Sequence, residues 1–312
     1  MSRDLVETGH ARAGRLASGL TTADRLLVAY CGFLTLAAWM RHPRPGPIVA
    51  ALAALALGHL ALASAAPRSA TARLAHDFFP ALSLAALFGI SGPVIAVTNA
   101  LRFDDVMAAA DLRLLGPVAE GWRQLLGRPA WLVDLASLAY VSYYPLPLGI
   151  GIAVYASHRR REYDDVVLAV VTTLVLCYLG YFLFPTTGPR VPAGLEDAVL
   201  GGGAVSRGVR AFVATAEANL LDAFPSGHTA IALVSLGVGW RSLPRARPLL
   251  LLVAAGIVFA TVYLSYHYVV DVLAGAALAL AVPHLTPWLR RALGPQAPAT
   301  AAGEIAGSER AA

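Results

Sequence analysis

The chain has 312 residues, of which 57% are hydrophobic and only 14% are charged. This excludes an ordinary soluble domain, in which about a quarter of the residues carry charge, and the repeated apolar runs indicate a membrane protein. The net charge of +5 comes from arginine, since the chain has no lysine. Those arginines form short clusters between apolar runs, a pattern that argues against binding to nucleic acid.

Eight apolar runs predict membrane-spanning helices, because a span needs about 20 predominantly apolar residues. They are Leu26–Met40, Ile48–Ala66, Phe78–Thr98, Ala130–Ala156, Val166–Phe184, Ala223–Trp240, Leu249–Tyr266 and Val269–Leu289. The first run is short for a span. Pro145, Pro147 and Gly149 predict a kink in the fourth, enclosed by neighbouring helices. The expected fold is an all-α polytopic membrane helical bundle with about eight transmembrane helices.

The polar and small-residue stretches divide the chain further. Residues 1–25 are predicted to be a cytoplasmic tail, and residues 26–291 a membrane domain with its catalytic core at about 98–289. The Ala/Gly/Ser-rich residues 292–312 are predicted to be a disordered tail.

Two further segments lie between predicted spans. Asn99–Pro129 has apolar residues at helical spacing between aspartates and arginines, and predicts an extracytoplasmic amphipathic helix that covers the site. Val191–Leu221 is glycine-rich and is expected to be a mobile loop.

Arginine placement predicts the orientation of the bundle, because inside segments are enriched in Lys and Arg. With the N-terminus inside, fifteen of the 24 arginines fall inside and nine outside. The dense clusters Arg159–Arg161 and Arg241–Arg247 are then inside, whereas Arg41 and Arg44 violate the rule. This orientation brings three polar motifs to the outer ends of spans.

Two of those motifs carry histidines at the edge of apolar runs. Phe224–Ala230 reads FPSGHTA, and Thr261–Gly275 reads TVYLSYHYVVDVLAG. If the residues after His267 are helical, Asp271 shares a face with it. A carboxylate there can hold one imidazole nitrogen and leave the other free to attack.

This pair of motifs, PSGH followed by HxxxD, resembles the type 2 phosphatidic acid phosphatase superfamily over roughly Thr98–Gly275. Phe184–Arg190, FPTTGPR, is similar to the first motif of its inositol phosphorylceramide synthase-like (inositolphosphotransferase) branch. The usual first motif has a lysine that this chain lacks, and the usual third motif has an arginine where Thr261 stands. The synthase-like branch departs in the same way.

The resemblance implies roles for the three central residues. His267 is the candidate nucleophile that forms a phosphohistidine, and Asp271 orients it. His228 is expected to protonate the leaving oxygen and later to deprotonate the acceptor. Two histidines and one aspartate could suggest zinc, but the PSGH setting argues otherwise, so we expect no metal and no cofactor.

Three further residues are expected to bind the substrate phosphate. Arg190 would contact phosphoryl oxygens through its guanidinium, and Ser226 and the Gly227 amide would donate at a helix N-terminus. The alternatives stay open: Arg190 as a snorkelling arginine and Ser226 as an N-cap.

The sequence gives weaker support for a functional role of several other polar residues. Asp111, Tyr140, Tyr143 and Tyr144 resemble recurring positions of the synthase-like branch, but a solvated helix face and an aromatic belt explain them equally well. No role is assigned to the remaining histidines, which have no partner pattern. These are His10, His42, His59, His76, His158 and His284.

The predicted function is a membrane-embedded phosphoesterase or phosphotransferase that cleaves a lipid phosphoester, with water or an alcohol as acceptor. The expected substrate is a phospholipid or a polyprenyl- or sphingolipid-type phosphate. The alternative is a non-catalytic protein that binds or transports lipid phosphates on the same fold. The expected location is the bacterial plasma membrane, with the active site on the extracytoplasmic side. Protein partners are not predicted.

Overall fold

The computed structural model describes residues 19–191, 195–216 and 219–294, and this part of the chain is helical without strands. Helices are expected here, because a chain inside a bilayer must satisfy its backbone hydrogen bonds internally. The described residues confirm the predicted all-α membrane bundle. The predicted tails lie mostly outside this range, although the first described helix begins at Thr22 and the last ends at Leu293.

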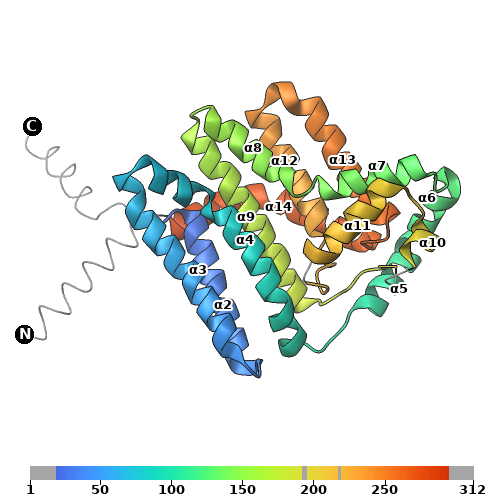
Figure 1. Ribbon diagram of the computed structural model, residues 1–312, viewed down its shortest axis with the longest axis horizontal. Coiled ribbons are helices and arrows are strands. Elements are labelled where there is room, and N and C mark those ends of the chain that lie inside the picture. Colours follow the sequence, from blue (N-terminus) through green and yellow to red (C-terminus); the bar gives the residue numbers. More distant parts are fainter. Residues whose placement is uncertain (1–18, 192–194, 217–218, 295–312) are drawn as a thin grey trace, which may run out of the picture.

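The first three helices form a group at one side of the bundle (Figure 1). They are α2 (Thr22–Arg41), α3 (Pro45–Ala65, extended by a 3₁₀ turn over Ala66–Arg68) and α4 (Ala70–Thr98). Thr21 caps α2, and its hydroxyl accepts from the amide of Asp24 while the Asp24 carboxylate accepts from the amide of Thr21. The capping box explains why the short first run forms a full helix of 20 residues.

The predicted kink in the fourth run is confirmed. The run forms α7 (Ala130–Val141) and α8 (Pro145–Ala156), which are bent by 51° relative to each other. Pro145 begins α8; it has no backbone N–H to donate to the carbonyl of Val141, where α7 ends, and its ring would clash with that carbonyl in a continuous helix. The helix therefore ends and restarts at this position.

The remaining helices of the bundle pack around one central helix. Around α12 (Gly227–Ser242) pack α8, α9 (Arg160–Leu183), α13 (Arg247–Tyr263) and α14 (Val269–Leu293). Six described helices are long and apolar enough to cross a membrane, or seven if the bent pair is one span. The difference from the eight predicted spans is α12, whose 16 residues fall short of the length of a full crossing.

The segments expected outside the membrane are also helical. The predicted amphipathic helix is two helices, α5 (Asp104–Leu115) and α6 (Val118–Leu126), separated by a glycine and a proline. The predicted loop at 191–221 is wrong, because it contains α10 (Glu196–Leu200) and α11 (Ala204–Ala216). Asp134 of α7 accepts from the amides of Gly203 and Ser206, which fastens the start of α11 to the bundle.

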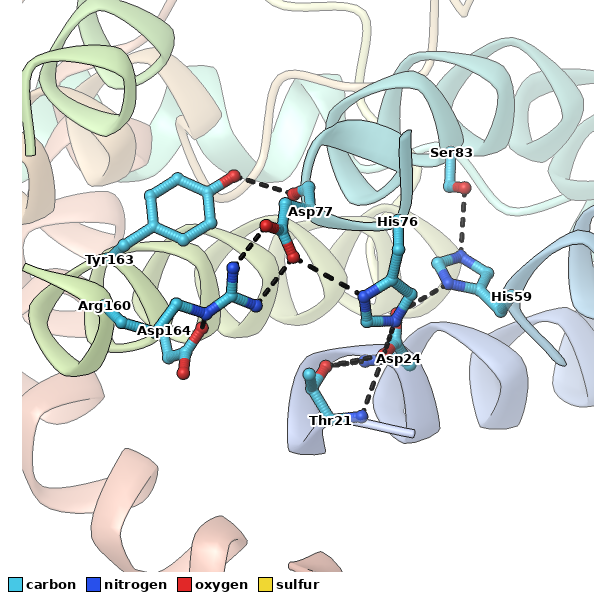
Figure 2. A network of polar contacts seen from close by, with 9 residues as sticks. All are labelled: Thr21, Asp24, His59, His76, Asp77, Ser83, Arg160, Tyr163 and Asp164. Carbon is cyan, nitrogen blue, oxygen red and sulfur yellow. Dashed lines mark hydrogen bonds and ion pairs between the residues drawn. The ribbon is translucent and has the colours of Figure 1, made fainter. Parts of the chain in front are cut away.

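Two histidines to which the sequence assigns no role have a partner in the structure. His59 of α3 and His76 of α4 both contact the buried carboxylate of Asp24, at 2.8 and 3.0 Å (Figure 2). This network joins the first three helices. The sequence pattern missed it because each residue comes from a different helix.

The connectivity of the helices makes the predicted orientation testable. Arg160 begins α9 and Arg245 lies between α12 and α13, at the end of the bundle opposite the motifs. Reporters fused near these arginines should read cytoplasmic, and a reporter near Gly202 should read extracytoplasmic. A cytoplasmic reading at Gly202 would contradict the predicted outer site.

Candidate active site

The three motifs meet at one end of the bundle. The Ala223 amide donates to the Thr186 carbonyl at 2.9 Å, and the Ser226 amide donates to the Asp271 carbonyl at 3.0 Å. These bonds join the end of α9 to the start of α12, and α12 to the start of α14. The predicted convergence is therefore present in the structure.

Glycines permit the close approach of these segments. Gly188 has a positive φ of 79°, and a Cβ on it would lie 2.4 Å from the Tyr266 carbonyl oxygen. A Cβ on Gly275 would lie 2.5 Å from the Ser226 carbonyl oxygen. A side chain at either position would force the motifs apart.

His267 lies in the turn between α13 and α14 and is buried. Its Nδ1 atom is 3.0 Å from the Ala223 carbonyl oxygen. Because a carbonyl oxygen only accepts, Nδ1 carries the proton and donates it, which leaves the lone pair on Nε2. The imidazole is thereby held in the tautomer that a nucleophile at Nε2 requires.

Asp271 lies in the first turn of α14, one helical turn after His267. Its Oδ2 atom is 3.5 Å from His267 Nδ1 and accepts from the Tyr268 amide at 2.9 Å. The carboxylate is thus near the expected nitrogen, but the Ala223 carbonyl takes the shorter contact. A buried carboxylate at this distance stabilises positive charge on the imidazole.

His228 lies in the first turn of α12, and its ring centroid is 5.8 Å from that of His267. The rings of Tyr140 and Tyr143 both pack against it, with centroid separations of 4.2 Å. Tyr144 packs edge-on against Tyr143. Two of the three tyrosines therefore contact His228 directly, which an aromatic belt facing lipid would not do.

Arg190 is the last residue of the first motif and points toward the same cluster. Its guanidinium donates to Asp222 Oδ1 at 2.9 Å and lies over the Tyr266 ring at 5.9 Å. Burial raises the pKa of the Asp222 carboxyl, and the charges of Arg190 and His267 oppose that rise. The sequence prediction missed Asp222, although an acidic residue two positions before FPSGHTA was a usable signal.

Ser226 is the N-cap of α12. Its Oγ accepts from the Thr229 amide at 3.2 Å, which is the alternative considered for it. A hydroxyl that accepts one bond can still donate another, so capping and phosphate binding are compatible. Gly227 is the first residue of α12, where a backbone N–H has no acceptor within the helix.

Helix α5 supports the site from outside. Asp104 accepts from the amides of Thr187 and Gly188, both at 3.0 Å, and Asp111 accepts from the Val270 amide at 2.8 Å. Asp111 therefore contacts the start of α14 and does not belong to a solvated face. Sequence reasoning missed Asp104, whose partners lie more than 80 residues away.

The side chains of the site do not form a metal-binding cluster. Within the described ranges, no three His, Cys, Asp or Glu side chains gather closely enough to hold a metal ion. The charged groups beside His267 are Arg190, Asp222 and Asp271.

Comparisons with known proteins agree with this geometry. A phosphoinositol dihydroceramide synthase from Bacteroides thetaiotaomicron is 28% identical over 163 residues, which cover 46% of this chain and 52% of that protein. The chain therefore spans about half the length of this curated relative. No solved structure gives a significant match. The family model of the PAP2 superfamily matches residues 106–285, a stretch that contains all three motifs, and the chain belongs to this superfamily.

Proposed function

We propose that this integral membrane protein cleaves a lipid phosphoester through a phosphohistidine on His267 and passes the phosphorus group to an alcohol or to water. The observation that carries this proposal is the contact of His267 Nδ1 with the Ala223 carbonyl, which leaves Nε2 as the attacking atom. Membership of the PAP2 superfamily supports the cleavage of a lipid phosphoester. The site end of the bundle would face the extracytoplasmic side of a bacterial plasma membrane.

The first half of the reaction forms the intermediate. His267 Nε2 attacks phosphorus, an N–P bond forms, and the bond from phosphorus to the leaving oxygen breaks. His228 gives its proton to that oxygen. Arg190, the Ser226 hydroxyl and the Gly227 amide would hold the phosphoryl oxygens, and Asp271 would stabilise the positive charge on His267.

The second half reverses the proton transfer. His228 takes a proton from the acceptor hydroxyl as its oxygen attacks phosphorus, and the N–P bond to His267 breaks. Between the two halves His228 is neutral, because it has given its proton to the leaving oxygen, and it can therefore act as the base. Water and an alcohol use the same residues, so the choice of acceptor depends on how well the site excludes water.

An alcohol acceptor is favoured by the name of the relative, which is a synthase. The burial of both histidines, at 5% and 8% exposure, is consistent with a site that restricts water. Transfer of a phosphoalcohol group to a sphingoid-type alcohol is therefore the first candidate, and hydrolysis is the second.

A product assay tests this proposal. Purified protein in lipid nanodiscs with EDTA is given headgroup-labelled phosphatidylinositol or phosphatidic acid, with and without dihydroceramide. We expect the label to appear on dihydroceramide for transfer, or in a water-soluble product for hydrolysis. His267→Ala serves as the inactive control. If neither product forms beyond this control, the protein is a lipid-phosphate binder; activity that requires a divalent ion would overturn the metal-independent route.

A further inference from the structure

A cavity of about 330 Å³ opens from the site and lies against α9 between α4 and α8. At the site end it is lined by Asp222, Gly227 and His228. At the far end it is lined by Asp77 of α4 and Tyr163 of α9. The cavity therefore begins where the substrate phosphate is proposed to bind and continues through the bundle.

The residues of α9 that line the cavity show how long it is. Tyr163, Val167, Val170, Leu174, Tyr178 and Tyr181 line it at helical spacing. The rise of an α-helix places the first and last of these about 27 Å apart along the axis. The hydrocarbon core of a bilayer is about 30 Å thick, so one leaflet contributes only about 15 Å. The cavity is thus nearly as long as the whole core.

The apolar lining of the cavity favours a hydrocarbon chain as its ligand. Between its two ends, the described lining consists of valine, leucine, alanine, proline, glycine, isoleucine and aromatic side chains. The lining residues of α9 from Val166 to Leu174 carry no polar side chain, so a polar group placed beside them would lose its hydrogen bonds to water without replacement. Ala81 and Ala85 of α4 are exposed along this wall, where their small side chains leave room for a chain to enter from the bilayer.

The far end is closed by a fixed polar network (Figure 2). The buried Asp77 carboxylate is held by the guanidinium of Arg160, and the Tyr163 hydroxyl donates to the Asp77 carbonyl at 2.7 Å. His76 lies 3.5 Å from Asp77 and 3.0 Å from Asp24. Displacing one member would leave a buried charge unpaired, so a hydrocarbon chain stops at this floor.

On the other side of the Asp77 network, the residues that line the space are more polar. A second cavity of about 240 Å³ shares Asp77, Pro80, Tyr163 and Val167 with the first, but most of its other lining residues, such as Thr21, Asp24 and Arg160, are polar or charged. A hydrocarbon chain that entered this second cavity would remove water from polar groups without replacing their hydrogen bonds, so its entry is unfavourable. The network thus separates a hydrocarbon cavity from a polar one.

We propose that this cavity binds one hydrocarbon chain longer than a single leaflet, which runs from the phosphate beside His228 to the floor at Asp77. The assignment rests on the proposed function, because the phosphate at the site anchors the chain. The substrate is then a lipid phosphate with a chain long enough to cross most of the membrane. A polyprenyl chain and a very long saturated chain share this chemistry.

Photolabelling at the chain end tests the assignment without relying on turnover. The probes are monophosphates with a diazirine on the last carbon, in saturated and polyprenyl forms, with chains that extend about 27 Å or about 15 Å. We expect the long probes to label α4 near Ala81 and α9 near Val167, and the short probes to label near Leu174. Far-end labelling by either form supports a long chain, and labelling by one form alone identifies its type.

Two variants that block the cavity, and one control variant that does not, test whether the far-end label depends on the cavity. Ala81→Phe and Val170→Phe place a ring inside the cavity, and each should abolish the far-end label of the long probes while the short probes still react. Leu82→Phe, one residue along but facing away from the cavity, should leave the pattern unchanged. Long probes that label only lipid-facing residues, or the same far-end label in both variants, would overturn the proposal.

The labelling result is independent of the chemistry at His267. If the expected pattern appears but none of the probes is turned over, the chain assignment stands and the proposed function fails. If the probes are turned over without far-end labelling, the proposed function stands and the chain assignment fails.

Discussion

Replacing His267 with alanine is expected to abolish turnover and covalent labelling together. In the proposed scheme His267 Nε2 forms the bond to phosphorus, and no other atom replaces it. Removing the nucleophile from a hydrolase costs on the order of 10⁶-fold in rate. The measurement is the rate of product formation together with acid-labile phosphorus label on the protein after rapid quenching with a radiolabelled substrate.

Two variants serve as controls for this result. His284→Ala removes an exposed histidine from α14, the helix that follows His267, and should retain both activity and label. Asp271→Asn should retain partial activity, because it weakens the stabilisation of His267 without removing the attacking nitrogen. Acid-labile label at wild-type levels in His267→Ala would show that another residue is the nucleophile.

Replacing His228 with alanine should produce a defect that depends on the leaving group. His228 is proposed to protonate the leaving oxygen, and general acid catalysis is typically worth about 10²–10⁴-fold. An alkyl phosphoester should therefore be severely slowed in His228→Ala. A p-nitrophenyl phosphoester should be cleaved with a much smaller loss, because p-nitrophenolate leaves without a proton.

The same variant should accumulate the intermediate. Breakdown of the phosphohistidine uses His228 as the base, so the activated substrate should leave more label on the protein in His228→Ala than in the wild type. Equal losses on both substrates would show that His228 does not act as the general acid.

Much of the fold could be predicted because its determinants are local. Seven of the eight apolar runs form helices, or a bent helix pair, consistent with a membrane crossing. The kink at Pro145 follows from the geometry of proline. The order of the spans, together with the arginine count, places the three motifs at one end, since each crossing reverses the direction of the chain.

The amino-acid motifs alone are enough to single out His228, His267 and Asp271, because their spacing is the signature of a known family. Their positions and their proximity could therefore be predicted from the sequence. Their roles stay predictions that the two histidine variants address.

Only the tertiary structure decided what surrounds these residues. The pairing of Arg190 with Asp222, the packing of Tyr140 against His228 and the contact of Asp111 with α14 join parts of the chain that no periodicity connects. The start of α11 inside the predicted loop was likewise decided by Asp134 of α7, a capping group from another helix.

The buried network around Asp24 and the cavity along α9 have the same origin. Hydrophobic periodicity reports which face of a helix avoids water, but not which neighbour covers that face. A buried carboxylate is stable only where partners from other helices supply hydrogen bonds and opposite charge, and His59, His76 and Arg160 reach this part of the bundle only after α3, α4 and α9 have packed. The sequence by itself therefore determined the spans and the motifs, whereas the three-dimensional packing of the helices decided the network and the cavity.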